Sequence, residues 1–348
     1  MTAGVHSPVT VDVVPGVPGP EWNEFVHAHA AGSVFHLSEW AAVYGELSWI
    51  EPCYLQARRG AAVVGVMPLA LVRWWPRGRA LVSAPYCVEA GALGLSAAIQ
   101  SDLEDTAAAL ARTHQAAFLE VRQSAGAHVA WPATGRFCGF ARALAPTVAA
   151  NRQAIPRKQR AMIRKGEAAG LVVGGPLGSA AFYQLYALSV RNLGTPVFAP
   201  QLFAAIARHL APYVDTLSVH HHGRLVAAVM SFYFRDCVLP YYAGALPQAR
   251  ALKAYDFMYW RLLCAALERG CTRFDFGRSV RDSGAYAFKK NWGFEPRSLC
   301  YQLLPIASSG DHSLDPDSPF NRLARQLWSR LPLPVANTLG PLLARRLF

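Results

Sequence analysis

The sequence predicts a mixed α/β protein that consists of two similar lobes, with a boundary near residue 150. Short strand-like runs alternate with helical segments in both halves of the chain. Residues 53–74 and 216–246 also share one plan: a strand, a short turn with Gly and a basic residue, then a strand with small side chains. The 348 residues, 53% of them hydrophobic, are enough to bury the cores of two domains, which excludes a disordered chain.

The first half begins with a helical region at 21–47, in which Ser38 is a candidate N-cap. Residues 53–74 form two predicted strands around an Arg-Arg-Gly turn. The remaining predicted elements are a strand and loop at 79–93, an alanine-rich helix at 96–115 and a strand at 116–124.

A basic helix at 157–169, which ends at Gly170, opens the second half. Residues 216–246 form three predicted strands with turns at His-Gly and Arg-Asp. The other predicted elements are strands at 171–175 and 272–277 and helices at 179–192, 200–210 and 255–270.

The segment after residue 306 differs in kind from the two lobes. A polar loop is followed by an amphipathic helix, with apolar residues on one face and arginines on the other. Pro332 ends this helix, and 335–348 can form a second short apolar and basic segment. Two alternatives stay open: the tail packs back on the protein, or it lies on anionic lipid. The apolar face consists of Phe320, Leu323, Leu327 and Leu331, and the basic face of Arg322, Arg325 and Arg330.

Hydropathy predicts neither a membrane span nor a secretory signal. The longest uncharged apolar run, 60–72, is shorter than the roughly 20 residues of a spanning helix and contains Pro68. The first 20 residues have no basic start and no unbroken apolar core. We therefore expect a cytoplasmic protein.

The net charge of +12 is concentrated in two places. Residues 151–170 contain six Lys or Arg and one Glu, and residues 321–348 contain five Arg and no acid, so the two stretches supply ten of the twelve charges. We expect any polyanionic partner, whether membrane lipid, RNA or a phosphate-bearing substrate, to bind there. A nucleic-acid role would rest on the basic helix alone, and such a helix is more often a solvated face.

Cysteine and histidine patterns do not predict a metal site. The seven cysteines are scattered singly without C-x-x-C spacing, which is typical of reduced core thiols. His220, His221 and His222 are consecutive, so strand alternation separates their side chains. We expect an exposed hairpin tip there rather than convergent metal ligands.

The stretch FDFGRSVRDSGAYAFKKNWGFEP, 274–296, is the best candidate for a site. Strand alternation places Phe274 and Phe276 on one face and Asp275 on the other, and Gly277 lets the backbone bend. Four aromatic residues then surround two lysines. A lysine in such a partly dry place can stabilise an oxyanion, although the same pattern also fits a snorkelling surface lysine. These residues are Tyr286, Phe288, Lys289, Lys290, Trp292 and Phe294.

Several separated motifs resemble the FemAB-related proteins, in particular the branch associated with exosortase/PEP-CTERM exopolysaccharide systems. The motifs are IPRKQRAMIRKGEAAGL, GTPVF, VLPYYAGAL, FDFGRS, FKKNWGFEP and the tail LPLPVANTLGPLLARRL, so the resemblance covers nearly the whole chain. It implies two tandem acyltransferase lobes of the GNAT type. The lobes are residues 1–150 and 151–306, with the site in the second, followed by a basic amphipathic tail at 307–348.

The resemblance also implies an amide-forming transfer in the biosynthesis of peptidoglycan or exopolysaccharide, with an amine-bearing envelope precursor as acceptor. Known relatives use aminoacyl-tRNA, but this chain has no room for the helical arm that some of them carry. The GNAT resemblance makes acyl-CoA the rival donor. The corresponding loop, 248–257, contains no glycine, although a helix N-terminus there can still bind phosphate. No permanently bound cofactor and no metal is expected.

We assign the site residues on this basis. Lys289 matches the lysine of the family's Phe-Lys motif and is the expected oxyanion group. Tyr286 and Arg278 are expected to orient the acceptor, and Asp275 to steer Arg278 or the amine; an ion pair of Asp275 with Arg278 that fixes the turn is the alternative. The expected substrate-binding residues are Phe288, Trp292, Tyr86, Glu89, Tyr242, Arg157, Lys158 and Arg164.

A second class of function stays open. A degenerate transferase could act without catalysis, as a membrane-surface assembly or binding factor for polysaccharide export. The expected contact with an anionic membrane surface, through 320–348 and from the inner face of the cytoplasmic membrane, is common to both hypotheses.

Overall fold

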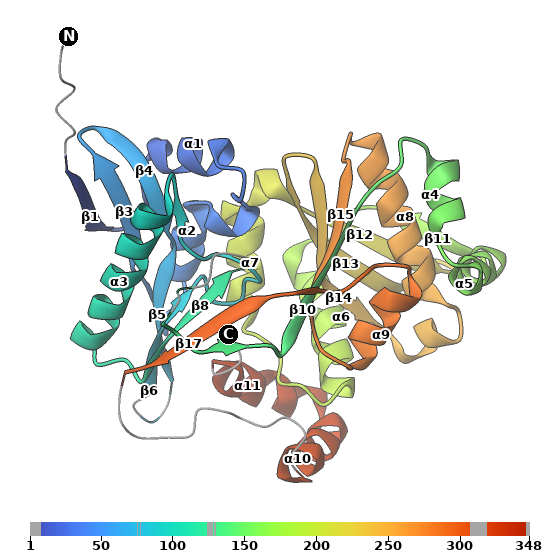
Figure 1. The fold of residues 1–348 in the computed structure, drawn as a ribbon. Helices are drawn as coiled ribbons and strands as arrows, with labels where there is room; N and C mark the ends of the chain where they lie inside the picture. The colour runs from blue at the N-terminus through green and yellow to red at the C-terminus, as the bar shows by residue number, and fades with distance from the viewer. Residues whose placement is uncertain are drawn as a thin grey trace. The chain divides into compact units, whose positions relative to one another are not determined.

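The computed structural model describes residues 8–74, 76, 78–123, 128, 130–306 and 319–345, with only the backbone at 319–323 (Figure 1). The chain divides into two compact units. The first unit consists of residues 1–135, 299–312 and 345–348, and the second of residues 136–298 and 313–344. Within the described residues, no helix is long and apolar enough to cross a membrane.

The first unit contains two sheets, one with strand order β1-β3-β4-β7 and the other with order β2-β5-β6-β8-β17-β9. The long helix α3 packs its apolar face on β3 and β4, where Ile99 and Leu103 join the buried core. The elements are β1 (Val9–Val14), α1 (Pro20–Ala28), α2 (Glu39–Gly45), β2 (Ile50–Pro52), β3 (Tyr54–Arg59), β4 (Ala62–Met67), β5 (Leu69–Trp74), β6 (Gly78–Ser83), β7 (Leu93–Gly94), α3 (Ala97–Thr113), β8 (Phe118–Gln123), β9 (Ala133–Thr134) and β17 (Cys300–Pro305).

The predicted second strand of 53–74 is in fact two strands. Pro68 separates β4 from β5, and the two belong to different sheets. Proline has no backbone N–H, so it cannot donate within a ladder, and the chain changes sheets at this residue.

The second unit is built on one seven-stranded sheet with order β11-β12-β13-β14-β15-β10-β16. Helix α8 packs on this sheet and on α5, and α6 packs on β14 (Figure 1). The elements are β10 (Phe137–Ala143), α4 (Val148–Ala154), α5 (Arg157–Ala168), β11 (Leu171–Gly174), α6 (Ser179–Asn192), α7 (Pro200–His209), β12 (Val214–His221), β13 (Arg224–Phe234), β14 (Cys237–Ala245), α8 (Ala254–Glu268), β15 (Arg273–Val280), α9 (Gly284–Asn291), β16 (Arg297–Ser298), α10 (Pro319–Arg330) and α11 (Leu333–Ala344).

The division between the units differs from the predicted boundaries at 150 and 306. Strand β10, which precedes residue 150, pairs with β15 and β16 of the second unit. Strand β17, which precedes residue 306, pairs with β8 and β9 of the first unit. Each unit therefore completes a sheet with a strand that the sequence places in the other half.

The histidine run lies where it was expected. His221 ends β12, and the chain turns at His222 and Gly223, which both have positive φ, before β13 begins. All seven cysteines are free thiols; Cys237 and Cys300 are half-buried and the others are buried.

The tail packs on the second unit as two helices. The Arg191 Nη1 of α6 donates to the Ser329 backbone oxygen of α10 at 3.0 Å. On α11, Gly340 lies against Val197 in the connection between α6 and α7. The loop at 307–318 and the side chains of Phe320, Arg322 and Leu323 lie outside the described residues.

Candidate active site

The ladder between β14 and β15, in the middle of the sheet, is short. The two strands pair in parallel at Cys237–Arg273 and Val238–Phe274, close to where both strands begin. Strand β14 also carries a bulge, because Tyr242 lies opposite Met230 and Pro240 lies opposite Ser231, which leaves Tyr241 as the extra residue. Bulges of this kind redirect backbone groups and are frequent beside active sites.

Gly277 bends β15 after this ladder ends. Its φ of +64° lies in the left-handed region, and its backbone N–H donates to the Asp275 Oδ1 at 2.8 Å. The register between β15 and β10 shifts at the same place. The bend directs three successive backbone carbonyls, those of Phe276, Gly277 and Arg278, toward one point.

Lys289 of α9 fills that point. Its Nζ donates to the carbonyl oxygens of Phe276 at 2.6 Å, Gly277 at 3.3 Å and Arg278 at 2.9 Å. The ammonium also lies 5.5 Å from the centre of the Phe140 ring, and the residue is only 9% exposed. Burial lowers the pKa of this amine to about 8, although Asp275 raises it.

The Lys289 ammonium therefore lies over the rings of Phe140 and Phe276, and its three N–H groups all have backbone acceptors. An ammonium group has three donors and no acceptor. A substrate oxygen could bind Lys289 only by replacing one of the carbonyls, and the 3.3 Å contact with Gly277 is the longest of the three.

The other residues assigned to catalysis lie around Lys289. Asp275 is buried and forms ion pairs with the Arg273 Nη2 at 3.6 Å and the Arg297 Nη2 at 3.9 Å. Arg278 places its guanidinium 4.8 Å from the centre of the Phe137 ring. The half-buried Tyr286 packs edge-on against Phe140, with ring centres 5.3 Å apart.

Phe288 and Trp292 belong to one aromatic wall between α8 and α9. Tyr259 contacts both rings, with centre distances of 5.7 and 6.4 Å. Trp292 is 1% exposed, and its Nε1 donates to the Asp256 Oδ1 at 3.1 Å, which places it in the core rather than at a ligand surface. Burial raises the pKa of Asp256, whose Oδ1 also accepts from the Gln159 Nε2 at 2.8 Å.

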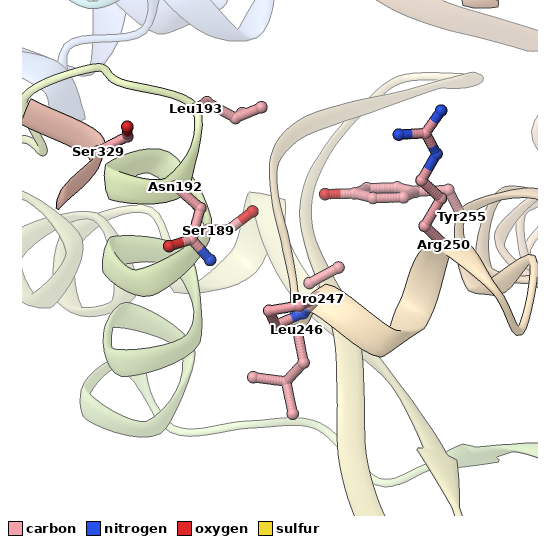
Figure 2. A pocket seen from close by; sticks show the side chains of 9 residues that line it. Ser189, Asn192, Leu193, Leu246, Pro247, Arg250, Tyr255 and Ser329 are labelled. Carbon is pink, nitrogen blue, oxygen red and sulfur yellow. The ribbon is translucent and has the colours of Figure 1, made fainter. Parts of the chain in front are cut away.

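A cavity of about 460 Å³ opens at the end of β14 (Figure 2). Its volume is in the range of small-molecule sites. Polar groups from α6, α8, α10 and the loop after β14 line it, together with apolar side chains from the C-cap of α6, the end of β14 and the same loop. The lining residues are Ser189, Asn192, Leu193, Ala245, Leu246, Pro247, Arg250, Tyr255 and Ser329.

The polar lining of the cavity can bind an anion and an uncharged polar group. Figure 2 shows the Tyr255 hydroxyl pointing toward Ser189, with which it is hydrogen-bonded. Burial raises the pKa of this phenol, so it stays a neutral donor. Arg250 supplies a cation beside the start of α8, where backbone amides are free of helical acceptors. The Tyr255 ring stacks on Tyr259 with centres 6.3 Å apart, so the aromatic wall reaches the cavity.

None of these cavity residues was assigned individually from the sequence. The loop 248–257, which includes Arg250 and Tyr255, was predicted as the candidate phosphate-binding loop. Ser189 and Ser329 belong to helices that are distant in the sequence, so the sequence pattern does not predict that the two residues line one cavity.

Four of the remaining assigned residues lie on β14 and α5 of the second unit. Tyr242 on β14 is buried among the rings of Tyr186, Phe198 and Phe203. The basic residues Arg157, Lys158 and Arg164 are exposed on α5.

Two assigned residues belong to the first unit. Tyr86 has a φ of +65°, its hydroxyl accepts from the Trp49 Nε1 at 3.0 Å, and burial raises its pKa to about 12. Glu89 is half-buried, and its backbone oxygen accepts from the Ser33 Oγ at 3.3 Å.

Comparisons with known proteins agree with this architecture. Residues 149–290 match the acetyltransferase (GNAT) domain family, and no curated protein sequence matches the chain. The crystal structure of FemX is similar with a TM-score of 0.64 at 14% identity, over 89% of this chain and 98% of that chain. A tandem GNAT protein from the clavulanic acid biosynthesis pathway has a TM-score of 0.54 at 15% identity, over 87% of this chain and 100% of that chain.

A third similar structure is the C-terminal domain of a protein assigned as a lysylphosphatidylglycerol synthetase from Agrobacterium fabrum. Its TM-score is 0.57 at 12% identity, over 83% of this chain and 91% of that chain. At such identities the likeness shows the fold alone. The predicted fold class, mixed α/β with two GNAT-like lobes, is confirmed, and the matched domain contains Lys289 and most of the cavity.

Proposed function

We propose that the second unit is an N-acyltransferase that moves an acyl group from an activated donor to an amine acceptor. The observation that carries the proposal is the cavity beside Arg250, which lies at the end of β14 within the range that matches the acetyltransferase domain. The early end of the pairing between β14 and β15, after Val238–Phe274, also supports it.

Acyl-CoA is the donor that these observations favour. The matched family is an acetyltransferase family, and Arg250 with the start of α8 offers an anion site to a diphosphate. Aminoacyl-tRNA is the rival donor, and the exposed cations of α5 are its candidate contacts.

The proposed reaction needs little from the protein beyond positioning and charge stabilisation. The lone pair of a neutral amine attacks the carbonyl carbon of the thioester or ester. A C–N bond forms, the C–S or C–O bond breaks, and the amine proton leaves to water or to the departing group. An α-amine with a pKa of about 8 is partly neutral near pH 7, so a strong base is not required.

In this proposal Lys289 stabilises the oxyanion by exchanging its longest carbonyl contact, with Gly277, for the substrate oxygen. Tyr286 and Arg278 lie beside the Lys289 ammonium and orient the acceptor. The Asp275 carboxylate offsets the positive charge of the ammonium. Phe288 contributes the apolar wall that excludes water.

We place the acceptor in the cell envelope. The family resemblance points to an amine-bearing precursor of peptidoglycan or of a PEP-CTERM-associated exopolysaccharide. One similar structure has a name that describes transfer of a lysyl group to a phospholipid, which supports an acceptor at a membrane. We accordingly propose that the protein works as a peripheral protein at the inner face of the cytoplasmic membrane.

A donor-consumption assay tests the proposal. Purified protein is given pooled acyl-CoAs or pooled aminoacyl-tRNAs with mixed amines, and release of free CoA or deacylated tRNA is measured. We expect amine-dependent consumption of acyl-CoA, strongly reduced in Arg250→Gln and retained in Arg224→Gln, which removes an exposed arginine at the start of β13. Consumption of neither donor, or equal rates in the two variants, would contradict the proposal.

One observation favours a second candidate function. Because all three N–H groups of Lys289 have backbone acceptors, the lysine could serve the fold alone, as in a degenerate transferase that acts as an assembly or binding factor for polysaccharide export. That alternative expects no donor consumption by the wild type, and a loss of polysaccharide export on deletion of α10 and α11 but not in Arg250→Gln.

A further inference from the structure

Helix α11 packs with its small residues and exposes its large ones. Three residues spaced by four positions are buried: Ala336, Gly340 and Ala344. Four large apolar residues at positions i, i+4, i+7 and i+8 form the neighbouring face, and we call this face the α11 apolar face. Its residues are Val335, Leu339, Leu342 and Leu343, with exposed fractions of 41, 44, 53 and 52%.

This orientation is fixed by close packing. A Cβ atom added to Gly340 would lie 3.0 Å from the backbone nitrogen of Val197 and 3.1 Å from its Cγ1. These distances are tighter than most Cβ contacts, so a larger residue at position 340 would require Val197 to shift, and a rotation of the helix that buries its leucines here would lose the contact. An ordinary packing helix would bury its large apolar residues.

The charge near this face identifies the chemistry of a partner. Neither α10 nor α11 contains Asp or Glu, and the chain after residue 318 contains five arginines. Arg325 and Arg330 of α10 are exposed, as is Leu327 between them. An apolar face within a segment of one positive sign is complementary to a surface that is anionic outside and apolar beneath.

We propose that α11 lies in the interface of an anionic lipid bilayer, with the α11 apolar face inserted and the arginines of α10 near the phosphate groups. The helix has 12 residues, about 18 Å, which is shorter than the roughly 30 Å hydrocarbon core, so it would lie in the plane of the membrane. Docking by this route does not depend on any catalytic activity.

Docking would also place the cavity near the membrane. Ser329 of α10 lines the cavity, and α10 and α11 both contact α6. If the proposed function holds, this position selects acceptors that are attached to lipid.

Vesicle co-sedimentation with the full chain tests the docking. We expect the wild type to bind vesicles of phosphatidylcholine with phosphatidylglycerol, and to bind pure phosphatidylcholine much more weakly. Leu339→Ser/Leu342→Ser should weaken binding by about tenfold per leucine, because each change removes the insertion of one apolar side chain. Arg325→Gln/Arg330→Gln should weaken binding to anionic vesicles and reduce its sensitivity to salt.

The matched control is Leu95→Ser/Val172→Ser, which changes two exposed apolar residues outside the tail and should bind like the wild type. Circular dichroism and the thermal midpoint check that each variant is folded. The proposal is overturned if the wild type does not bind anionic vesicles, or if Leu339→Ser/Leu342→Ser binds as well as the control. It is also overturned if the wild type is a dimer in solution that this variant converts to a monomer, since the face would then be covered by a second copy.

Discussion

Replacing Lys289 with Met removes one buried charge and keeps most of the side-chain volume. In the folded protein burial lowers the pKa of this lysine from 10.5 to about 8. Each unit of pKa corresponds to about 1.4 kcal/mol, so retaining the charge at pH 7 costs the fold about 3 kcal/mol. The three backbone carbonyls that it satisfies offset this cost.

The pH dependence of stability isolates this charge. Between the folded pKa of about 8 and the unfolded value near 10.5, the unfolded chain binds more protons at this site than the folded chain. The free energy of unfolding therefore rises with pH across this window. Below the folded pKa, the full cost of burying the charged lysine is present. From pH 7 to pH 9.5 the wild type should gain about 2 kcal/mol relative to Lys289→Met.

Urea unfolding of the wild type and Lys289→Met at the two pH values measures this difference. The comparison cancels the contributions of cysteines and tyrosines, because these residues titrate in both proteins. Lys290→Met is the matched control, since Lys290 is the exposed neighbour on the same helix and should leave the pH slope unchanged. Parallel pH profiles for the wild type and Lys289→Met would refute the reasoning, because they would mean that the lysine is not held in a dry, carbonyl-lined place.

Two further changes test the packing around this point. Gly277→Ala places a Cβ at a φ of +64° and should lower the free energy of unfolding by about 1–2 kcal/mol in urea, whereas an unchanged midpoint would show that the bend is not required. Trp292→Phe keeps an aromatic ring in the core and removes the hydrogen bond to Asp256, which should lower the free energy of unfolding by about 1–3 kcal/mol. Donor consumption should change little. A large loss of turnover at unchanged stability would instead indicate that Trp292 belongs to the active site.

Local structure was largely predictable from the sequence. The helix predicted at 179–192 is α6 with the same bounds, and the three strands with turns at His-Gly and Arg-Asp are β12, β13 and β14. These elements have strong periodicity and clear turn residues. The strand prediction failed at Pro68, where the missing donor sends the chain from one sheet to another.

Long-range pairing was not predictable in the same way. The alternation of apolar and polar residues in β10 and β17 does not indicate which sheet each strand joins, because the same alternation fits any partner strand with a matching face. For this reason the predicted boundary falls after β10, which pairs with β15.

The residue types of the candidate site were predictable from the sequence, but the direction in which the Lys289 ammonium points was not. The aromatic residues of 274–296 were visible in the sequence, whereas Phe140, whose ring lies 5.5 Å from the Lys289 ammonium, comes from a distant strand. That the ammonium meets three carbonyls depends on the bend at Gly277, which is a backbone property. The cavity joins Ser189, Arg250 and Ser329 from three distant segments, so only the fold brings them together.

The most direct test of the proposed acyl transfer is the initial rate of donor consumption with and without an amine acceptor, compared between the wild type and Asn192→Trp. Asn192 is an exposed residue that lines the cavity, so the larger side chain should occupy part of the cavity without disturbing the core. Val172→Trp, at an exposed position on β11, is the control. We predict acceptor-dependent consumption in the wild type and the control, with a loss of at least about tenfold in Asn192→Trp, or about 1.4 kcal/mol in transition-state stabilisation. Equal rates in all three proteins, or no consumption that depends on the acceptor, would contradict acyl transfer at this cavity.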